Sequence, residues 1–411
     1  MRTAAVIGTF DTKGKEFAYL TACLEAFGVE TVTVDVGTGP SLELDADYRM
    51  SELIGEEILK AGPKEKRMKC LAAKADRVIG KLVSEGAIQG VISMGGGQGT
   101  FLAREIFSHI PIGFPKILVS TLAHMKDSAA QFGGLNDTLV MNSLVDIAGL
   151  NGVLRNVLRQ AAGALAGMLA NQSEAPEEVA KPAVGISCWG VTTPCVNEVR
   201  SVLEEHGYEV YAFHANGEGG AMLERFVKQG LLCGVADITL SEITMPMAGS
   251  YQETVPERLE TEGPEPIPRV VVPGGLDMVL RGREELKTLP GRKTYYHTPE
   301  VVFVRSTPQE NALFAAEICR RLGQLTGPVT LMLPQNGVSM ADSPEGPLYE
   351  PETDQVLFGG LRDNLPEGIR LIEMPCNIND KDFADKIAEE LIDKMEMEEK
   401  KDDSESKTCC S

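Results

Sequence analysis

The chain has 411 residues, of which 60 are acidic and 39 are basic, so its formal net charge is −21. Such a charge disfavours nucleic acids and anionic membrane surfaces as partners, because both are themselves negative. The length exceeds the roughly 250 to 300 residues that one hydrophobic core usually supports, so two domains are expected. The nine cysteines are odd in number and form no CxxC pair, which is typical of a reduced, cytoplasmic protein. No apolar run approaches the roughly 18 to 20 residues of a membrane helix.

The chain opens with a strand, a helix and a second strand, predicted at 4–7, 15–27 and 31–36. The loop after the first strand carries a group of polar side chains, which are Thr9, Asp11, Thr12 and Lys13. Hydroxyls and a lysine are suited to phosphate, and the carboxylate of Asp11 is suited to Mg²⁺. Capping of the helix by Asp11 or Thr12 explains the same residues equally well.

After a predicted helix at 66–85, the chain has another strand, loop and helix, from Gly90 to Phe107. The loop contains four glycines and ends in a hydroxyl residue at the predicted start of the next helix, namely Gly95, Gly96, Gly97, Gly99 and Thr100. Glycines let backbone N–H groups approach a ligand, and a helix N-terminus favours an anion. The spacing matches neither a Walker A motif nor GxGxxG. A phosphate site and an ordinary tight turn therefore both stay open.

The next buried strand, at 116–121, ends in Ser120 and Thr121, at the edge where parallel sheets bind ligands. A long helix is predicted at 142–169, and the polar, proline-flanked segment 171–182 is the predicted domain boundary. The fold class expected is α/β, with two Rossmann-like, doubly wound lobes and mostly parallel sheets. Their expected limits are 1–175 and 183–397, followed by a disordered charged tail at 398–411.

The second lobe begins like the first, with a strand at 183–187, a loop of small residues and a helix. Further strands are predicted near 208–213, 235–240, 269–272, 301–305 and 329–333, with helices at 311–322 and 382–397. The proline-rich span 246–268 is expected to be a surface loop. Two loops of this lobe offer phosphate ligands, at Gly190, Thr192 and Thr193 and at Glu218 to Gly220. Structural turns explain both loops equally well.

Six motifs resemble the UPF0261 family, the Tm-1-like ATP-binding domain, over about residues 1–395. They are GTFDTKGKE (Gly8 to Glu16), GGGQGT (Gly95 to Thr100), GISCWGVTTPCV (Gly185 to Val196), HANGEGG (His214 to Gly220), VVPGGLDMV (Val271 to Val279) and NINDKDFA (Asn377 to Ala384). The resemblance implies a homodimer of two-lobed subunits that bind ATP with Mg²⁺. It places the nucleotide at Gly8 to Lys13, Gly95 to Thr100 and Ser120 to Thr121, facing a cleft between the lobes.

Three hypotheses about activity stay open, and the catalytic residues are unknown. One is a nucleotide-dependent phosphoryl-transfer or hydrolytic enzyme that acts on an unknown small molecule, with Asp127 or Asp277 orienting the acceptor. Another is a non-catalytic module that ATP stabilises for a protein partner. A third is nucleophilic catalysis by Cys188 or Cys195 with His214.

Overall fold

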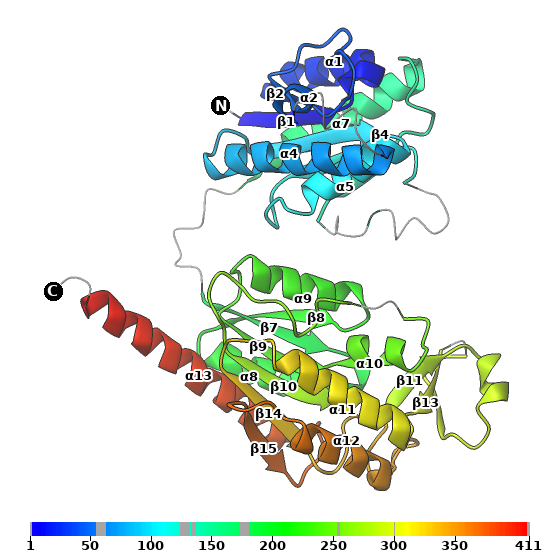
Figure 1. Cartoon of the computed structure of the whole chain (residues 1–411), viewed down its shortest axis with the longest axis vertical. Coiled ribbons are helices and arrows are strands. Elements are labelled where there is room, and N and C mark those ends of the chain that lie inside the picture. The colour runs from blue at the N-terminus through cyan, green and yellow to red at the C-terminus, as the bar shows by residue number, and fades with distance from the viewer. Residues whose placement is uncertain are drawn as a thin grey trace. The chain divides into compact units, whose positions relative to one another are not determined.

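The computed structural model describes residues 2–54, 63–123, 132, 137–172, 181–252, 255–299 and 301–408. The chain divides into two compact units, Met1–Glu177 and Glu178–Ser411 (Figure 1). The division falls inside the polar segment 171–182. Each unit has its own six-stranded sheet and its own hydrophobic clusters.

The N-terminal unit is a parallel sheet of order β3-β2-β1-β4-β5-β6 with helices on both faces. The strands are β1 (Arg2–Gly8), β2 (Val29–Asp35), β3 (Tyr48–Arg49), β4 (Gly90–Gly95), β5 (Lys116–Ser120) and β6 (Leu139–Asn142). Helices α1 (Phe10–Ala26) and α7 (Gly152–Ala170) cover one face, and α2 (Met50–Ile54), α4 (Lys64–Ser84) and α5 (Gly97–Phe107) cover the other. Strand residues alternate between the two faces, so Val6 packs in one cluster and Ile7 in the other.

The C-terminal unit repeats this arrangement with a parallel sheet of order β15-β14-β10-β9-β7-β8. Its strands are β7 (Ala183–Cys188), β8 (Glu209–His214), β9 (Gly234–Thr239), β10 (Arg269–Gly274), β14 (Val329–Pro334) and β15 (Arg370–Met374). Helices α8 (Thr193–Glu205) and α13 (Lys381–Thr408) cover one face. Helices α9 (Glu218–Lys228), α10 (Ser241–Met247), α11 (Pro308–Leu322) and α12 (Pro351–Asp363) cover the other.

A smaller antiparallel sheet is inserted between β10 and α11 of the C-terminal unit. It consists of β11 (Met278–Arg281), β12 (Thr294–Tyr296) and β13 (Val302–Arg305), with β13 in the middle. Phe303 of β13 packs with Trp189, which directly follows β7. The antiparallel sheet is thus anchored at the carboxyl end of a main-sheet strand.

The predicted fold class is confirmed, because both main sheets are parallel, have six strands and are flanked by helices. Several predicted boundaries differ. Helix α1 begins at Phe10 and α5 at Gly97, so each starts directly after its strand. The segment predicted as one helix from 142 contains the last residue of β6 and becomes helical only at Gly152. Helix α13 continues to Thr408, into the tail expected to be disordered.

The predicted loop at 246–268 is confirmed for the described residues after Met247, which contain no helix or strand, but the loop does not lie wholly on the surface. Arg258 and Leu259 are completely buried and Val255 is 6% exposed. The proline-rich composition indicated irregular backbone, but it gave no sign that a charged side chain of this span is held inside the protein.

Candidate functional site

The sequence-predicted residues gather where the strand order of the N-terminal sheet changes direction. Strand β1 lies between β2 and β4, and the register pairs Ile7 with Ser93. The loops that follow β1 and β4 therefore leave the same edge of neighbouring strands, Thr9 in one and Gly96 in the other. In doubly wound sheets this switch point is the usual place for a ligand.

The four glycines of the second loop have two different roles. A Cβ on Gly95 would lie 2.6 Å from Gly99 Cα, and one on Gly99 would lie 3.1 Å from Met94 O. These two glycines let α5 pack directly on the end of β4. Among the described residues, a Cβ on Gly97 would meet nothing within 4 Å, and one on Gly96 would meet only Thr121 Oγ1, at 3.4 Å. Within the part of the chain that the structure describes, Gly96 and Gly97 thus leave open space in front of the helix.

The N-terminus of α5 is uncapped, because Gly96 at the N-cap position has no side chain and none makes a cap hydrogen bond in the described structure. The first N–H groups of a helix have no partner inside the helix. Those of Gly97, Gln98 and Gly99 point to the switch point with the positive end of the helix dipole. An anion would complete this helix end.

Two of the predicted hydroxyl ligands instead bind each other. Thr100 Oγ1 and Ser120 Oγ share a hydrogen bond of 2.7 Å, and Leu122 N donates to Ser120 Oγ. Thr100 is 1% exposed and Ser120 is completely buried. These side chains join α5 to the end of β5, whereas Thr121 is partly exposed beside Gly96.

The loop after β1 is also internally bonded. Thr9 Oγ1 and Thr12 Oγ1 share a hydrogen bond of 3.0 Å, and Lys13 Nζ donates to Ile147 O. Lys13 has non-helical backbone angles, so α1 is kinked one turn after its start. The structure brings Thr9 to Lys13 to the predicted edge, but the ammonium of Lys13 is engaged by a carbonyl.

Asp11 is the predicted Mg²⁺ ligand, and half of its carboxylate is already used. Its Oδ2 accepts hydrogen bonds from Thr38 N and Gly39 N, at 3.0 and 2.9 Å. Its Oδ1 is buried without a hydrogen-bond partner in the described structure. The described residues contain no group of three or more His, Cys, Asp or Glu arranged for a metal ion. Asp11 therefore fits Mg²⁺ only as a single-oxygen ligand that leaves the other positions to phosphates and water.

Asp35 at the end of β2 was missed by the sequence analysis. Its Oδ1 accepts from Phe10 N and Gly37 N, and its Oδ2 accepts from Ser41 Oγ at 2.6 Å. The signal was a carboxylate near the end of the alternating pattern of the predicted strand 31–36. Asp35 holds the start of α1 against the loop that Asp11 also binds.

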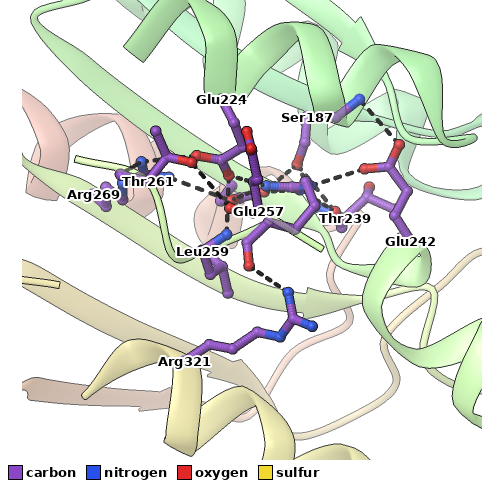
Figure 2. A network of polar contacts seen from close by, with 12 residues as sticks. Ser187, Glu224, Thr239, Glu242, Glu257, Leu259, Thr261, Arg269 and Arg321 are labelled. Atoms are coloured by element: carbon purple, nitrogen blue, oxygen red, sulfur yellow. Dashed lines mark hydrogen bonds and ion pairs between the residues drawn. The ribbon is translucent and has the colours of Figure 1, made fainter. Parts of the chain in front are cut away.

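The C-terminal unit contains a buried network of charges that includes Glu224, Glu242 and Arg269 (Figure 2). Arg258 donates to Asp237 at 2.6 and 2.8 Å, to Glu224 at 3.0 Å and to Glu242 at 2.8 Å. Arg269 also donates to Glu224, at 3.2 Å. Burial opposes ionisation of Asp237, but the Arg258 charge keeps its pKa below the usual value. Three carboxylates and two guanidinium groups thus fasten the span 246–268 to the main sheet.

The same network fills one of the two predicted phosphate loops of this unit. Glu242 Oε1 accepts from Gly217 N at 2.6 Å and from Gly220 N at 3.0 Å, at the start of α9. In the other loop, Thr192 Oγ1 bonds Thr239 Oγ1 and accepts from Trp189 N. Glu242 thus fills the first of these loops. In the second, Thr192 is engaged, whereas Gly190 and Thr193 are exposed.

A second buried group lies at the carboxyl ends of β10 and β14 and contains Asp277, Arg305, Asp342 and Asp354. Asp277 Oδ2 accepts from Ser339 Oγ at 2.8 Å, and Arg305 donates to Asp354. Burial and the Asp342 charge raise the pKa of Asp277 to about 7. Strongly shifted groups of this kind mark candidate functional positions. Asp277 was considered as an acceptor-orienting residue; Asp127, the other candidate, lies outside the described residues.

The proposed thiol nucleophile has unfavourable electrostatics. Cys188 and His214 are paired in the register of β7 and β8, which the sequence analysis could not foresee. Burial raises the pKa of the Cys188 thiol and, more strongly, that of Cys195. Since the thiolate is the reactive form, this pair does not support nucleophilic catalysis.

The NINDKDFA motif has a structural role at the carboxyl ends of the strands of the C-terminal sheet. Asn377 Nδ2 donates to the carbonyl oxygens of Asn336, Ser339 and Asp342, and Asn379 Nδ2 donates to Val191 O. These bonds connect the loop after β15 with the loops after β14 and β7. The motif therefore holds these three loops together.

These features define a two-unit α/β protein with Rossmann-like doubly wound sheets. Residues 2–174 match the model of the Uncharacterised protein family (UPF0261) N-terminal domain, and residues 181–395 match that of the UPF0261 C-terminal domain. The chain therefore belongs to the UPF0261 family, as its motifs indicated. No helix among the described residues is long and apolar enough to span a membrane.

Relatives from bacteria and a plant are similar over nearly the whole chain. A UPF0261 protein of Clostridium tetani is 34% identical over 403 residues, covering 95% of this chain and 98% of the relative. The ToMV resistance protein Tm-1(GCR237) of Solanum lycopersicum is 32% identical over 418 residues, covering 94% of this chain and 55% of the tomato protein. A solved structure of Methanocaldococcus jannaschii UDP-GlcNAc 2-epimerase aligns with 95% of this chain and 92% of its own at 11% identity, with a TM-score of only 0.23. That score carries no functional information.

Proposed function

We propose that the N-terminal unit binds ATP with Mg²⁺ at the switch point between β1 and β4. The observation that carries the proposal is the uncapped N-terminus of α5 behind the open glycines Gly96 and Gly97. Backbone N–H groups at such a helix end bind phosphate oxygens. The resemblance to a Tm-1-like ATP-binding domain supports the nucleotide, and Thr121 beside Gly96 supplies a hydroxyl.

The bound Mg²⁺ would supply positive charge to the phosphates, with Asp11 Oδ1 as its protein ligand. Thr9 and Thr12 would shape the opposite side of the site, and Lys13 would add a cation if it left Ile147 O. Thr100 and Ser120 would keep the loop in place through their mutual hydrogen bond.

The test is thermal unfolding with ATP, ADP and AMP, with and without Mg²⁺, on wild type, Gly97→Asp and Gly97→Asn. A ligand at 100 times its dissociation constant adds about 2.7 kcal/mol to the folded state. We expect Mg²⁺-dependent stabilisation by ATP in the wild type, no stabilisation in Gly97→Asp, and an intermediate effect in Gly97→Asn, which has a similar volume without the charge. The proposal is wrong if no nucleotide stabilises the wild type or if all three proteins respond alike.

Binding alone and turnover are separated by incubating the protein with ATP·Mg²⁺ and analysing the products. The name of the tomato relative refers to resistance, which suits a module that binds a protein partner. A carboxylate such as that of Asp11, at the proposed phosphate site, would suit phosphoryl transfer. Product formation that Asp11→Asn abolishes would favour the enzyme, and unchanged ATP would favour the module. A homodimer, an unknown small-molecule or protein partner and a cytoplasmic location remain predictions.

A further inference from the structure

The buried group of Asp277, Arg305, Asp342 and Asp354 connects the antiparallel sheet to the main sheet of the C-terminal unit. Asp277 lies between β10 and β11, and Arg305 is the last residue of β13. Asp342 follows β14, and Asp354 lies in the first turn of α12. Asp277 directly precedes β11 and Arg305 ends β13, so these two lie at the ends of antiparallel strands, whereas Asp342 and Asp354 belong to the rest of the unit.

Hydrogen bonds within this group cross between the two parts. Asp277 Oδ2 accepts from Ser339 Oγ at 2.8 Å, and Arg305 Nη2 donates to Asp354 and to Glu350 O. Ser306 N donates to Asp277 O at 2.8 Å, which joins β13 to the start of β11. Loss of any of these contacts would loosen the antiparallel sheet.

The group has more carboxylates than cations. Three carboxylates lie with one guanidinium, and none of the four side chains is more than 2% exposed. Asp277 Oδ1 and Asp342 Oδ1 are buried without a hydrogen-bond partner in the described structure. A proton on one of them would add the missing donor and remove one of the unbalanced charges.

We propose that a proton on Asp277 keeps the antiparallel sheet closed on the main sheet, and that loss of this proton releases it. Once Asp277 is ionised, it and Asp342 repel each other in a buried environment, while Arg305 is already paired with Asp354. Opening of the sheet hydrates the carboxylates and relieves this repulsion. Burial and the Asp342 charge raise the pKa of Asp277 to about 7 and that of Asp354 to about 8, which places the change at or just above neutral pH. Asp354 therefore needs its own control, and Asp354→Asn should leave the Asp277 transition in place.

Other ionisable groups lie on the elements around this cluster and have to be separated from Asp277. They are Arg281, Arg292, Lys293, His297, Glu310 and Glu350, of which Lys293 pairs with Glu350 and Arg292 with Glu310. Histidine is the one residue type among them that ordinarily titrates between pH 6 and 8. His297 packs near Phe303, at 6.4 Å between ring centroids, so it needs its own control.

Trp189 provides a built-in reporter, because it is the single tryptophan of the chain. Its ring meets Phe303 of β13 edge to face, with centroids 5.1 Å apart. Opening would separate these rings and wet the indole. We expect Trp189 emission to shift to longer wavelength between pH 6 and 9, with a midpoint near 7.

Three variants make the assignment specific. Asp277→Asn keeps a neutral side chain of the same shape and should stay closed up to pH 9. Asp342→Asn removes the charge that raises the pKa of Asp277 and should move the midpoint to lower pH. His297→Gln should behave as the wild type. A transition that persists in Asp277→Asn, or that disappears in His297→Gln, overturns the proposal, as does its absence from the wild type.

Hydrogen exchange of the wild type tests the same opening without a substitution. After correction for the intrinsic pH dependence, exchange of residues 278–305 should be at least tenfold faster at pH 9 than at pH 6, while residues 183–188 of β7 should not change. Equal protection of both segments at the two pH values would contradict the proposal even if a variant failed to fold.

Discussion

Gly95 and Gly97 lie two residues apart but tolerate different substitutions. A Cβ at Gly95 would lie 2.6 Å from the Cα of Gly99, and backbone cannot move away as a flexible side chain can. We expect Gly95→Ala to destabilise the protein by about 1 to 3 kcal/mol, as overpacking does. Gly97→Ala should stay within about 0.5 kcal/mol of the wild type, since its Cβ would meet none of the described residues within 4 Å. Urea unfolding of both variants measures the difference, and equal losses would refute this account of the loop.

The raised pKa of Asp277 also has a consequence for stability. The folded chain holds this proton up to about pH 7, whereas an unfolded aspartate loses it near pH ~3.9. Between these values the folded state binds more protons, so the free energy of unfolding falls as pH rises. The slope of one such group is at most about 1.4 kcal/mol per pH unit.

Comparison of wild type with Asp277→Asn isolates this contribution. Between pH 5 and 7 the wild type should lose more stability in urea unfolding than the variant does. Above pH 8 the difference between the two proteins should become constant. Parallel stability curves over the whole range would show that Asp277 is ionised in the folded protein.

At the scale of elements, the span between α10 and β10 is held by charge pairs. Arg258→Met would leave Glu224, Asp237 and Glu242 with less compensation in the interior, and breaking a buried pair costs about 3 to 5 kcal/mol. Arg320→Met is the matched control, because Arg320 pairs with Glu317 and Glu260 but its side chain is 48% exposed. Its loss should cost less than about 1 kcal/mol. Similar losses in denaturant unfolding would mean that the buried network adds little.

Much of the fold could be predicted because hydrophobic periodicity marks strands and helices directly. The loops after β1 and β4 could be assigned to one edge, since parallel strands end together. The pairing of Thr100 with Ser120 could not, because a hydroxyl at a strand end looks the same whether it faces a ligand or a neighbour. Arg258 gave no signal either: its partners Glu224, Asp237 and Glu242 are 34, 21 and 16 residues away, and only the folded sheet brings them together.

At the scale of the molecule, the two units share one topology. In each, the first strand lies between the second strand and the next long one, as β2-β1-β4 and β8-β7-β9. The family models divide the chain in the same way, at 2–174 and 181–395. Helices α5 and α10, which follow the corresponding strands β4 and β9, both begin without a side-chain cap from the described residues. The units differ at the strand end, because Thr239 of β9 bonds Thr192 across the second switch point, whereas β4 ends in Gly95, which has no side chain.

The number of nucleotides that one chain should hold follows from the position of Glu242 in the C-terminal unit. Its carboxylate takes the N–H groups of Gly217 and Gly220 that an anion would otherwise receive. Saturation with radiolabelled ATP in equilibrium dialysis should therefore reach one equivalent per chain, although the architecture is present twice. A value near two would mean that a triphosphate displaces Glu242. If one equivalent binds, only the N-terminal unit holds an exchangeable anion. In the C-terminal unit the carboxylate of Glu242, which is part of the chain, takes the place of that anion.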